Sequence, residues 1–307
     1  MRNERSSENN IPFDALQRVV GKATNSVIKS SDIIPIGQVN EVYDISLENR
    51  ESVIVRISKR GGDILEHERW ALDEARKTGV PTPTTLLIEH ISLGQDMIAI
   101  TVQEKIKGTP LAGLSETEKQ QILGKVGAII SKIHEVKTIG YGWTSVEGQG
   151  MYASWDQYLT KILSKSDRLL EVADRNKTDQ IVIVRALQFI EANRGAYAGD
   201  ARLVHRDLGP NHFLVEDRRV IGVIDFENCI GGDPVYDLAR WDLLYGHEYS
   251  TDAVKEGYTN QEIIQNNYDL RMKLYKIHAG LSIIDYLDTQ NETELAQSLA
   301  LQIFNLL

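Results

Sequence analysis

The amino-acid sequence predicts an α+β fold of two lobes, a small β-rich N-terminal lobe and a larger, mainly helical C-terminal lobe. Up to residue 103 the chain consists mostly of short strand-like runs, whereas amphipathic helical patterns dominate from residue 111 onward. Its 307 residues suffice for two lobes with a sizeable apolar core. We therefore expect an N-terminal lobe over residues 1–103 with a loose tail at residues 1–10, a hinge over residues 104–110 and a C-terminal lobe over residues 111–307.

Local signals define the elements of the N-terminal lobe. A helix begins at Pro12, because proline suits the first helical position. The other expected elements are strands over residues 42–47 and 53–57, a helix over residues 63–77 with Asp63 as its N-cap, and strands over residues 85–89 and 97–103.

Helical signals dominate the second lobe. Ser115, with Glu118 three residues later, is the capping-box signature of a helix that runs to about residue 134. Further amphipathic helices are expected over residues 155–164 and 178–193, and helices resume from about Pro234 to the end.

Two acidic residues in the second lobe each follow an apolar run that is typical of a strand. Asp207 comes shortly after residues 201–204, and Asp225 directly follows residues 220–224, with a third run at residues 213–215. A hairpin of this kind brings both carboxylates into one crevice. There, one acid can accept a proton from a hydroxyl group while the other holds a metal ion, as phosphoryl transfer requires.

Composition excludes several classes of protein. The 34 basic and 44 acidic residues give a net charge of −10, which argues against a nucleic-acid-binding surface. A single cysteine, Cys229, rules out an internal disulfide and indicates a reducing compartment. The N-terminus lacks the pattern of a secretory signal, and no apolar run is long enough to span a bilayer. We therefore expect a cytoplasmic protein without a membrane partner, and the sequence predicts no oligomeric state.

Three motifs carry a resemblance to a known family. His-Arg-Asp at residues 205–207 and Asp-Phe-Glu at residues 225–227 resemble the catalytic and metal loops of the protein-kinase-like fold. Gly-Asp-Pro-Val-Tyr-Asp-Leu-Ala-Arg at residues 232–240 resembles the GDPxxDLA stretch of the aminoglycoside phosphotransferase family, which includes antibiotic kinases, choline kinase and homoserine kinase. The resemblance extends from about Ile34 to about Gly246.

The resemblance implies an enzyme that uses Mg²⁺ and ATP, or GTP, to phosphorylate a hydroxyl group of a small molecule, with an aminoglycoside-type antibiotic as the leading substrate. The alternatives are a metabolic kinase acting on choline, homoserine or a sugar, and a catalytically silent nucleotide-binding protein. The segment between Asp225 and Asp233 is too short for the activation loop of a protein kinase. Neither the acceptor molecule and its hydroxyl group nor the choice between ATP and GTP can be read from the sequence.

The same resemblance assigns the central residues of the site. Asp207 is expected to be the catalytic base and Asp225 a ligand of Mg²⁺. The kinase pattern places a second metal ligand, asparagine, at the position of His212, with Asn211 one residue earlier. We favour His212, because some related antibiotic kinases also carry histidine there. Asn211 after a loop shift, or a weakly held second metal ion, are the alternatives.

Nucleotide-binding residues are expected in the N-terminal lobe and the hinge. Arg56 matches the strand lysine of kinases and would hold phosphates, with Glu68 as its partner and Glu66 as the competing candidate. The remaining candidates act through their backbone: Gly37, Gln38 and Asn40 toward the phosphates, and Gln103, Glu104 and Ile106 toward the adenine edge.

Carboxylates of the C-terminal lobe suit a cationic amino sugar as the substrate. The candidates are Glu227, Asp237, Asp242 and Asp156, each of which has a surface or capping role as its alternative. The family motif also favours Asp237 as a brace of the catalytic loop. Residues 140–155 resemble a loop before a helix in hygromycin-type kinases, and aromatic side chains there would either stack on a sugar or pack internally.

Overall fold

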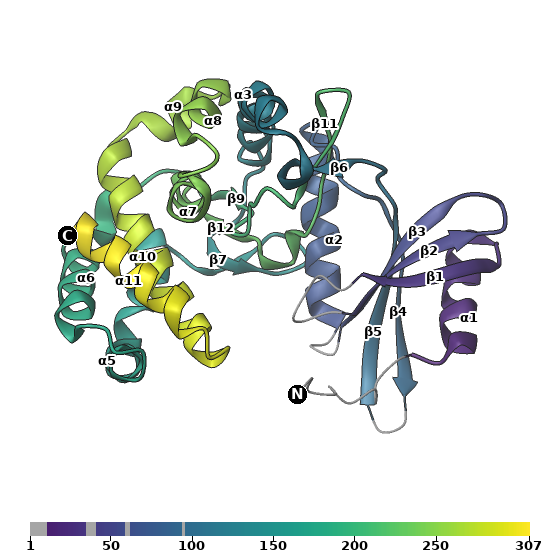
Figure 1. Cartoon of the computed structure of the whole chain (residues 1–307), viewed down its shortest axis with the longest axis horizontal. Coiled ribbons are helices and arrows are strands. Elements are labelled where there is room, and N and C mark those ends of the chain that lie inside the picture. Colours follow the sequence, from purple (N-terminus) through teal and green to yellow (C-terminus); the bar gives the residue numbers. More distant parts are fainter. Residues whose placement is uncertain (1–10, 35–40, 59–61, 94–95) are drawn as a thin grey trace. The chain divides into compact units, whose positions relative to one another are not determined.

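The structure, a computed structural model, describes residues 11–34, 41–58, 62–93 and 96–307 (Figure 1). The chain forms two compact units, Met1–Arg69 with Pro83–Lys107, and Trp70–Thr82 with Gly108–Leu307. The first unit is rich in strands and the second in helices, which confirms the predicted α+β class. The lobe boundaries expected at residues 103 and 111 stay a prediction, and the compact units place residues 70–82 with the second unit.

A five-stranded antiparallel sheet forms the first unit, in the order β1-β2-β3-β5-β4. Its strands are β1 (Ile28–Ile34), β2 (Glu41–Leu47), β3 (Ser52–Ser58), β4 (Thr85–Leu93) and β5 (Asp96–Glu104). Helix α1 (Phe13–Thr24) buries Leu16, Val19 and Val20 in the same apolar cluster as the sheet residues. The helix that begins after Pro12 therefore packs on the sheet.

Strand β1 is missing from the sequence-based prediction. Its first residue, Ile28, is buried and its last, Ile34, is half-buried, while the residues between them are exposed. It is the edge strand and pairs with β2 alone. No alternation of apolar and polar side chains marks such a strand, because backbone hydrogen bonds rather than side-chain burial hold it in the sheet.

Helices dominate the second unit, and helix α2 (Gly62–Lys77) runs from the first unit into it. The helices that follow are α3 (Glu116–Ile133), α4 (Trp155–Thr160), α5 (Ser166–Arg175), α6 (Gln180–Asn193), α7 (Val235–Tyr245), α8 (Thr251–Gly257), α9 (Gln261–Gln265), α10 (Tyr268–Thr289) and α11 (Thr293–Leu306). Within the described residues, none of these helices has both the length and the apolar character needed to cross a membrane.

Two small sheets complete the second unit. One has the order β11-β10-β6 and the other the order β8-β7-β12-β9. Their strands are β6 (Thr109–Pro110), β7 (Tyr141–Thr144), β8 (Gly150–Tyr152), β9 (Arg202–Val204), β10 (Phe213–Glu216), β11 (Arg219–Val223) and β12 (Ile230–Gly232).

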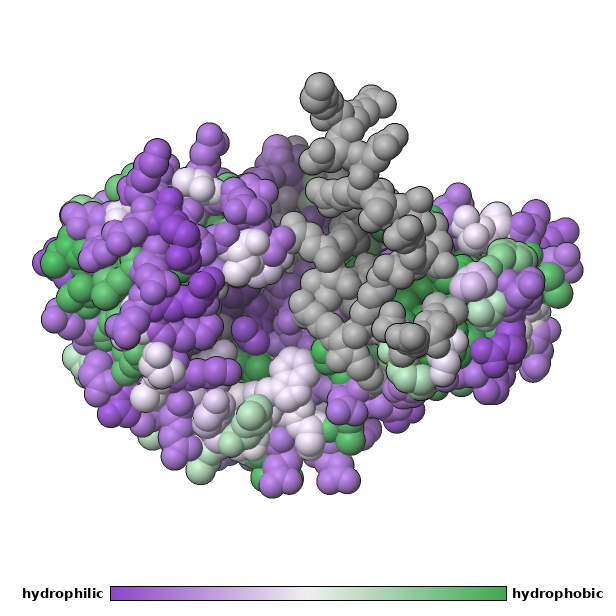
Figure 2. Space-filling model, turned by 90° about the horizontal axis from the view of Figure 1, so that it is seen from below, coloured by the Kyte–Doolittle hydropathy of each residue, from purple (hydrophilic) through white to green (hydrophobic). Residues whose placement is uncertain are grey.

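The face shown in Figure 2 is mostly hydrophilic, as expected when apolar side chains fill the core.

Several predicted boundaries differ from the observed ones. The helix expected over residues 155–164 ends at Thr160, and a 3-10 turn at Leu163–Lys165 separates it from α5. Asp63 does not cap α2, because the helix begins one residue earlier, at Gly62. The capping box of α3 is confirmed, since the Ser115 backbone N–H donates to the Glu118 carboxylate at 3.1 Å.

Part of the segment at residues 140–155, expected as a loop, forms the hairpin of β7 and β8. Gly142 permits this hairpin in two ways. Its φ of +76° lies in the left-handed region, and an added Cβ would come within 2.6 Å of the Tyr152 ring. The packing of Tyr152 against this glycine supports internal packing for that aromatic side chain.

Candidate active site

A β-hairpin brings the two acid-bearing loops together. Strands β10 and β11 pair with Phe213 opposite Val223, so the segment before β10 lies beside the segment after β11. The backbone N–H of Ile224 donates to the carbonyl of His212 at 3.1 Å and joins the two segments directly. Asp225, the next residue, is thereby placed near the loop that carries Asp207.

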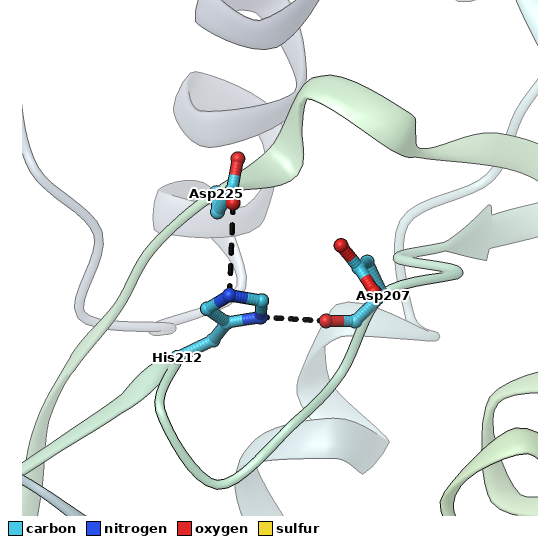
Figure 3. A group of neighbouring side chains, drawn as sticks. All are labelled: Asp207, His212 and Asp225. Atoms are coloured by element: carbon cyan, nitrogen blue, oxygen red, sulfur yellow. Dashed lines mark hydrogen bonds and ion pairs between the residues drawn. The ribbon is translucent and has the colours of Figure 1, made fainter. Parts of the chain in front are cut away.

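Asp207, His212 and Asp225 form one cluster, in which each offers a ligand atom within 4.8 Å of the others (Figure 3). His212 lies between the two acids. Its Nδ1 is 2.6 Å from the backbone carbonyl of Asp207, and its Nε2 is 3.6 Å from Oδ2 of Asp225. A carbonyl only accepts, so Nδ1 carries the proton and, in the neutral ring, Nε2 presents its lone pair toward Asp225.

This donor set fits a divalent cation. The Asp225 carboxylate supplies a hard oxygen donor of the kind that Mg²⁺ prefers, and the hydrogen bond of Nδ1 orients the His212 imidazole as metal-ligating histidines require. The carboxylate side chains are about a third exposed, 38% for Asp207 and 32% for Asp225, so an ion can reach them. Asn211 lies exposed in the turn before β10, whereas His212 belongs to the cluster, and the choice between them as a metal ligand stays a prediction.

The backbone is strained on both sides of the cluster. Arg206, directly before Asp207, has a φ of +67°, and Asp225 itself has a φ of +71°. Residues other than glycine rarely adopt this conformation, which costs of order 1 kcal/mol or more and persists where the surroundings enforce it. Such residues gather at functional sites, and both of these adjoin or belong to the acid cluster.

Asp237 from α7 enforces the turn at Arg206. Its carboxylate accepts the backbone N–H of His205 at 2.8 Å and that of Arg206 at 2.7 Å. The His134 imidazole lies 3.1 Å from the same carboxylate. Burial works to raise the pKa of Asp237, but the hydrogen bonds from His134 and the loop backbone outweigh it and lower this pKa below its usual value. Asp237 is therefore an ionised brace of the loop.

Of the two roles expected for Asp237, the structure supports the brace of the catalytic loop over a contact with the substrate. The residue is only 1% exposed, and both of its oxygens accept hydrogen bonds from within the protein. His205, which is fully buried, also has an organising role. Its Nε2 donates to the Ile224 carbonyl at 3.2 Å, and burial lowers its pKa and keeps the ring neutral.

The other three substrate candidates occupy different surroundings. Glu227 lies in the 3-10 turn after Asp225 and is 9% exposed. Asp156 forms an ion pair with Arg194. Asp242 accepts from Thr251 and Lys276 at 2.7 and 2.8 Å. It lines a cavity of about 340 Å³ together with Gln120, Gly246, His247, Glu248, Ser250, Thr251 and Asp252. The substrate roles of Glu227, Asp156 and Asp242 stay predictions.

The expected ion pair of the nucleotide site is present in the first unit. Arg56 on β3 pairs with Glu68 on α2, and both are buried, with 8% and 1% of their surface exposed. Glu66, the competing candidate, pairs with Arg69 instead. The role of Arg56 and Glu68 in binding phosphates stays a prediction.

The hinge candidates lie at the end of β5. Gln103 is buried, Glu104 is the last strand residue and its backbone N–H donates to Thr84, and Ile106 follows the strand half-buried. Their contact with adenine stays a prediction. Gly37, Gln38 and Asn40 lie outside the described residues.

Arg240 directly follows the GDPxxDLA stretch and has no role in the sequence-based prediction. One of its terminal guanidinium nitrogens is 3.8 Å from Oδ1 of Asp207. The available signal was helical spacing, because Arg240 lies three residues after Asp237 and on the same side of α7.

Replacing Asp225 with alanine should weaken Mg²⁺-dependent nucleotide binding by roughly 100-fold, because the expected metal-binding pair of Asp225 and His212 loses its carboxylate. Calorimetric titration of nucleotide with and without Mg²⁺ measures the effect. Asp167→Ala, at an exposed aspartate of α5, is the control. Asn211→Ala should leave the affinity unchanged if His212 is the ligand. Equal affinities for Asp225→Ala and the unchanged protein would remove Asp225 from the metal site.

A buried histidine should make stability depend on pH. His278 hydrogen-bonds Tyr236 at 3.0 Å, and burial, then the charges of Arg206 and Arg240, lower its pKa from 6.5 to about 3. The unfolded chain therefore binds this proton more readily. The contribution of neutral His278 to the free energy of unfolding is therefore complete above pH ~6.5. It is lost as the pH falls toward 3, at up to about 1.4 kcal/mol per pH unit.

Denaturant unfolding between pH 7.5 and 5 tests this dependence. His278→Gln should flatten the slope of unfolding free energy against pH by up to about 1.4 kcal/mol per unit. His90→Gln is the matched control, because His90 is exposed. An identical slope in the His278 variant and the unchanged protein would show that His278 is not the responsible group.

Comparison with known proteins shows the family to which the chain is related. The profile of the phosphotransferase enzyme family matches residues 32–268. The hygromycin-B 4-O-kinase of Escherichia coli is 23% identical over 176 residues, which cover 56% of this chain and 50% of that protein. The chain thus spans about half the length of this curated relative.

Solved structures of low sequence identity share the fold. The aminoglycoside phosphotransferase APH(4)-Ia has a TM-score of 0.76 at 17% identity, over 96% of this chain and 99% of that chain. A putative fructosamine-3-kinase from Haemophilus somnus 129PT has a TM-score of 0.66 at 17% identity, over 95% and 97% of the two chains. These likenesses confirm the predicted protein-kinase-like fold. Because the family profile extends over most of the sequence, the chain belongs to the phosphotransferase enzyme family.

Proposed function

We propose that this protein transfers the γ-phosphoryl group of ATP, or of GTP, to a hydroxyl group of an aminoglycoside-type compound. The cluster of Asp207, His212 and Asp225 carries the proposal, because it combines a base with a metal-binding donor set. The curated relative is named as a hygromycin-B kinase, and a structure of APH(4)-Ia with a TM-score of 0.76 is a ternary complex with ADP and hygromycin B. The proposal places the enzyme in the cytoplasm, where ATP is available.

Asp207 acts on the acceptor in this proposal. Its carboxylate accepts a hydrogen bond from the substrate hydroxyl group, orients the oxygen and takes the proton as the bond to phosphorus forms. The strained turn at Arg206, pinned by Asp237, holds that carboxylate in place before the substrate arrives. Positioning of this kind removes entropy cost from the reaction step.

Asp225 and His212 would hold Mg²⁺. The ion supplies positive charge that neutralises the phosphate oxygens during transfer. Arg56, kept in place by Glu68, would bind nucleotide phosphates through its guanidinium group. The chain's net charge of −10 favours a polycationic acceptor through long-range attraction.

The test is an assay of purified protein with Mg²⁺, ATP or GTP, and a panel of acceptors. The panel contains hygromycin B, other aminoglycosides, choline, homoserine and a fructosamine. Nucleoside diphosphate release is measured by a coupled assay, and the phosphorylated product by mass spectrometry. Growth of a sensitive host that expresses the protein then separates antibiotic from metabolic acceptors.

Each outcome selects one function. Turnover stimulated by an aminoglycoside, with host protection, supports the proposal. Turnover with a fructosamine, choline or homoserine alone would assign the protein to metabolic kinases, a candidate favoured by its likeness to putative fructosamine-3-kinases. Saturable nucleotide binding without stimulation by any acceptor would identify a catalytically silent protein.

A further inference from the structure

Helix α7 contacts the loop of Asp207 at two successive points. Asp237 accepts the backbone N–H groups of His205 and Arg206. Arg240, one turn further along the helix, reaches the next residue of the loop with its guanidinium group 3.8 Å from Oδ1 of Asp207. The same helix thus holds the loop backbone with a carboxylate and approaches the reactive side chain with a cation.

Arg240 is a largely, but not fully, buried cation. Only 14% of its side chain is exposed, and its Nε is buried without a hydrogen-bond partner. Among the residues that the structure describes, Asp207 is the one carboxylate that forms an ion pair with it. A buried donor that lacks an acceptor costs about 1–3 kcal/mol, so stability alone does not explain an arginine here.

The separation of the two groups suits catalysis better than a tight salt bridge would. At 3.8 Å the guanidinium attracts the carboxylate but does not donate a normal hydrogen bond to it. A bidentate pair would occupy the oxygen lone pairs of Asp207 that must accept the substrate proton. The looser pair directs the carboxylate and leaves those lone pairs available.

We infer that Arg240 is a positioning residue, which orients the Asp207 carboxylate toward the acceptor hydroxyl group through its charge. The inference rests on the proposed phosphotransferase function, in which Asp207 is the base. Tyr245, also on α7, packs closely against Gly209 of the same loop. A Cβ added at Gly209 would lie 2.8 Å from the Tyr245 hydroxyl oxygen. The loop therefore packs closely against α7 and can transmit this orientation.

Steady-state kinetics with the best acceptor separates positioning from binding. Arg240→Met, which keeps the length of the side chain without its charge, should lower kcat roughly 10–100-fold and change KM for either substrate by less than about threefold. Arg240→Lys, which keeps the positive charge, should retain part of the kcat that Arg240→Met loses. Added guanidinium ion, at concentrations that leave the protein folded, should partly restore the kcat of Arg240→Ala. Arg185→Met, at an exposed arginine of α6, is the control and should match the unchanged protein.

A double-mutant cycle shows whether Arg240 acts through Asp207. In the background of Asp207→Asn, the Arg240→Met change should have almost no further effect on kcat, because the carboxylate that it orients is gone. Additive losses, an unchanged kcat in Arg240→Met, or a loss confined to KM would each overturn the inference.

A crystal structure of the Arg240→Met variant supplies a measurement that does not depend on turnover. The Asp207 carboxylate should move or lose its single orientation, while the backbone hydrogen bonds from His205 and Arg206 to Asp237 remain. An unchanged Asp207 side chain would overturn the inference even if the enzyme is active. A displaced side chain in a protein that phosphorylates no acceptor would show that Arg240 orients the Asp207 carboxylate but would refute the proposed function.

Discussion

Asp207→Asn should lower kcat for phosphoryl transfer by roughly 10²–10⁴-fold, the contribution expected of a general base. The amide has the shape of the carboxylate but cannot take the proton of the acceptor hydroxyl group. The substitution leaves the backbone contacts of the loop in place, because the N–H of Asp207 donates to His205 at 3.3 Å and its carbonyl accepts from His212. Nucleotide affinity and thermal stability should therefore change little.

The matched control for Asp207→Asn is Asp217→Asn. Asp217 lies exposed in the turn between β10 and β11 with a φ of +48°, a conformation that asparagine tolerates. Single-turnover measurements with saturating substrates isolate the transfer step from product release. A rate for Asp207→Asn within a few-fold of the unchanged protein would exclude Asp207 as the base and leave positioning and metal binding as the main sources of catalysis.

Arg271→Met should destabilise the fold by about 3–5 kcal/mol, the usual cost of removing one partner from a buried ion pair. Arg271 is 1% exposed and donates to Asp233 at 2.9 Å, and Tyr275 donates its hydroxyl to the same carboxylate. Burial raises the pKa of Asp233, the charge of Arg271 opposes that rise, and removing the arginine leaves a buried negative charge.

Denaturant unfolding measures this loss, and pH supplies a second test. A carboxyl group whose pKa rises on folding destabilises the protein at higher pH. The loss in the free energy of unfolding caused by Arg271→Met should therefore shrink as the pH falls and Asp233 takes up a proton. The double variant Arg271→Met, Asp233→Asn should cost less than the sum of the single changes. Lys137→Met, at the exposed ion pair with Asp200, should cost less than about 1 kcal/mol. A similarly small cost for Arg271→Met would show that its pair with Asp233 contributes little.

Local patterns explain which elements could be predicted. Strands β2, β3 and β5 alternate or bury apolar residues, and α3 carries its capping box in four consecutive residues. Strand β1 was missed because it is an exposed edge, and the break after Thr160 was missed because an amphipathic pattern continues across it. Tertiary packing decides such cases, and the local sequence does not show it.

Some features of the acid cluster could likewise be predicted from the sequence, whereas others required the structure. Asp207 and Asp225 could be located because each follows a strand in a recognisable motif. The family motif already favoured Asp237 as a brace, but its contacts required the structure, since its partner His134 is 103 residues away in the sequence. The orientation of His212 also required it, because a backbone carbonyl determines which ring nitrogen faces Asp225.

The sequence by itself determined the α+β class, the resemblance to small-molecule kinases and the two acids on which the chemistry depends. These features follow from short-range periodicity, turn residues and contiguous motifs. Only the tertiary structure decided which carboxylate braces the loop, which nitrogen of His212 faces Asp225, and that Arg240 faces Asp207. Burial, hydrogen-bond partners and charge separation arise between residues distant in the chain, and the free energy of those contacts depends on the folded geometry.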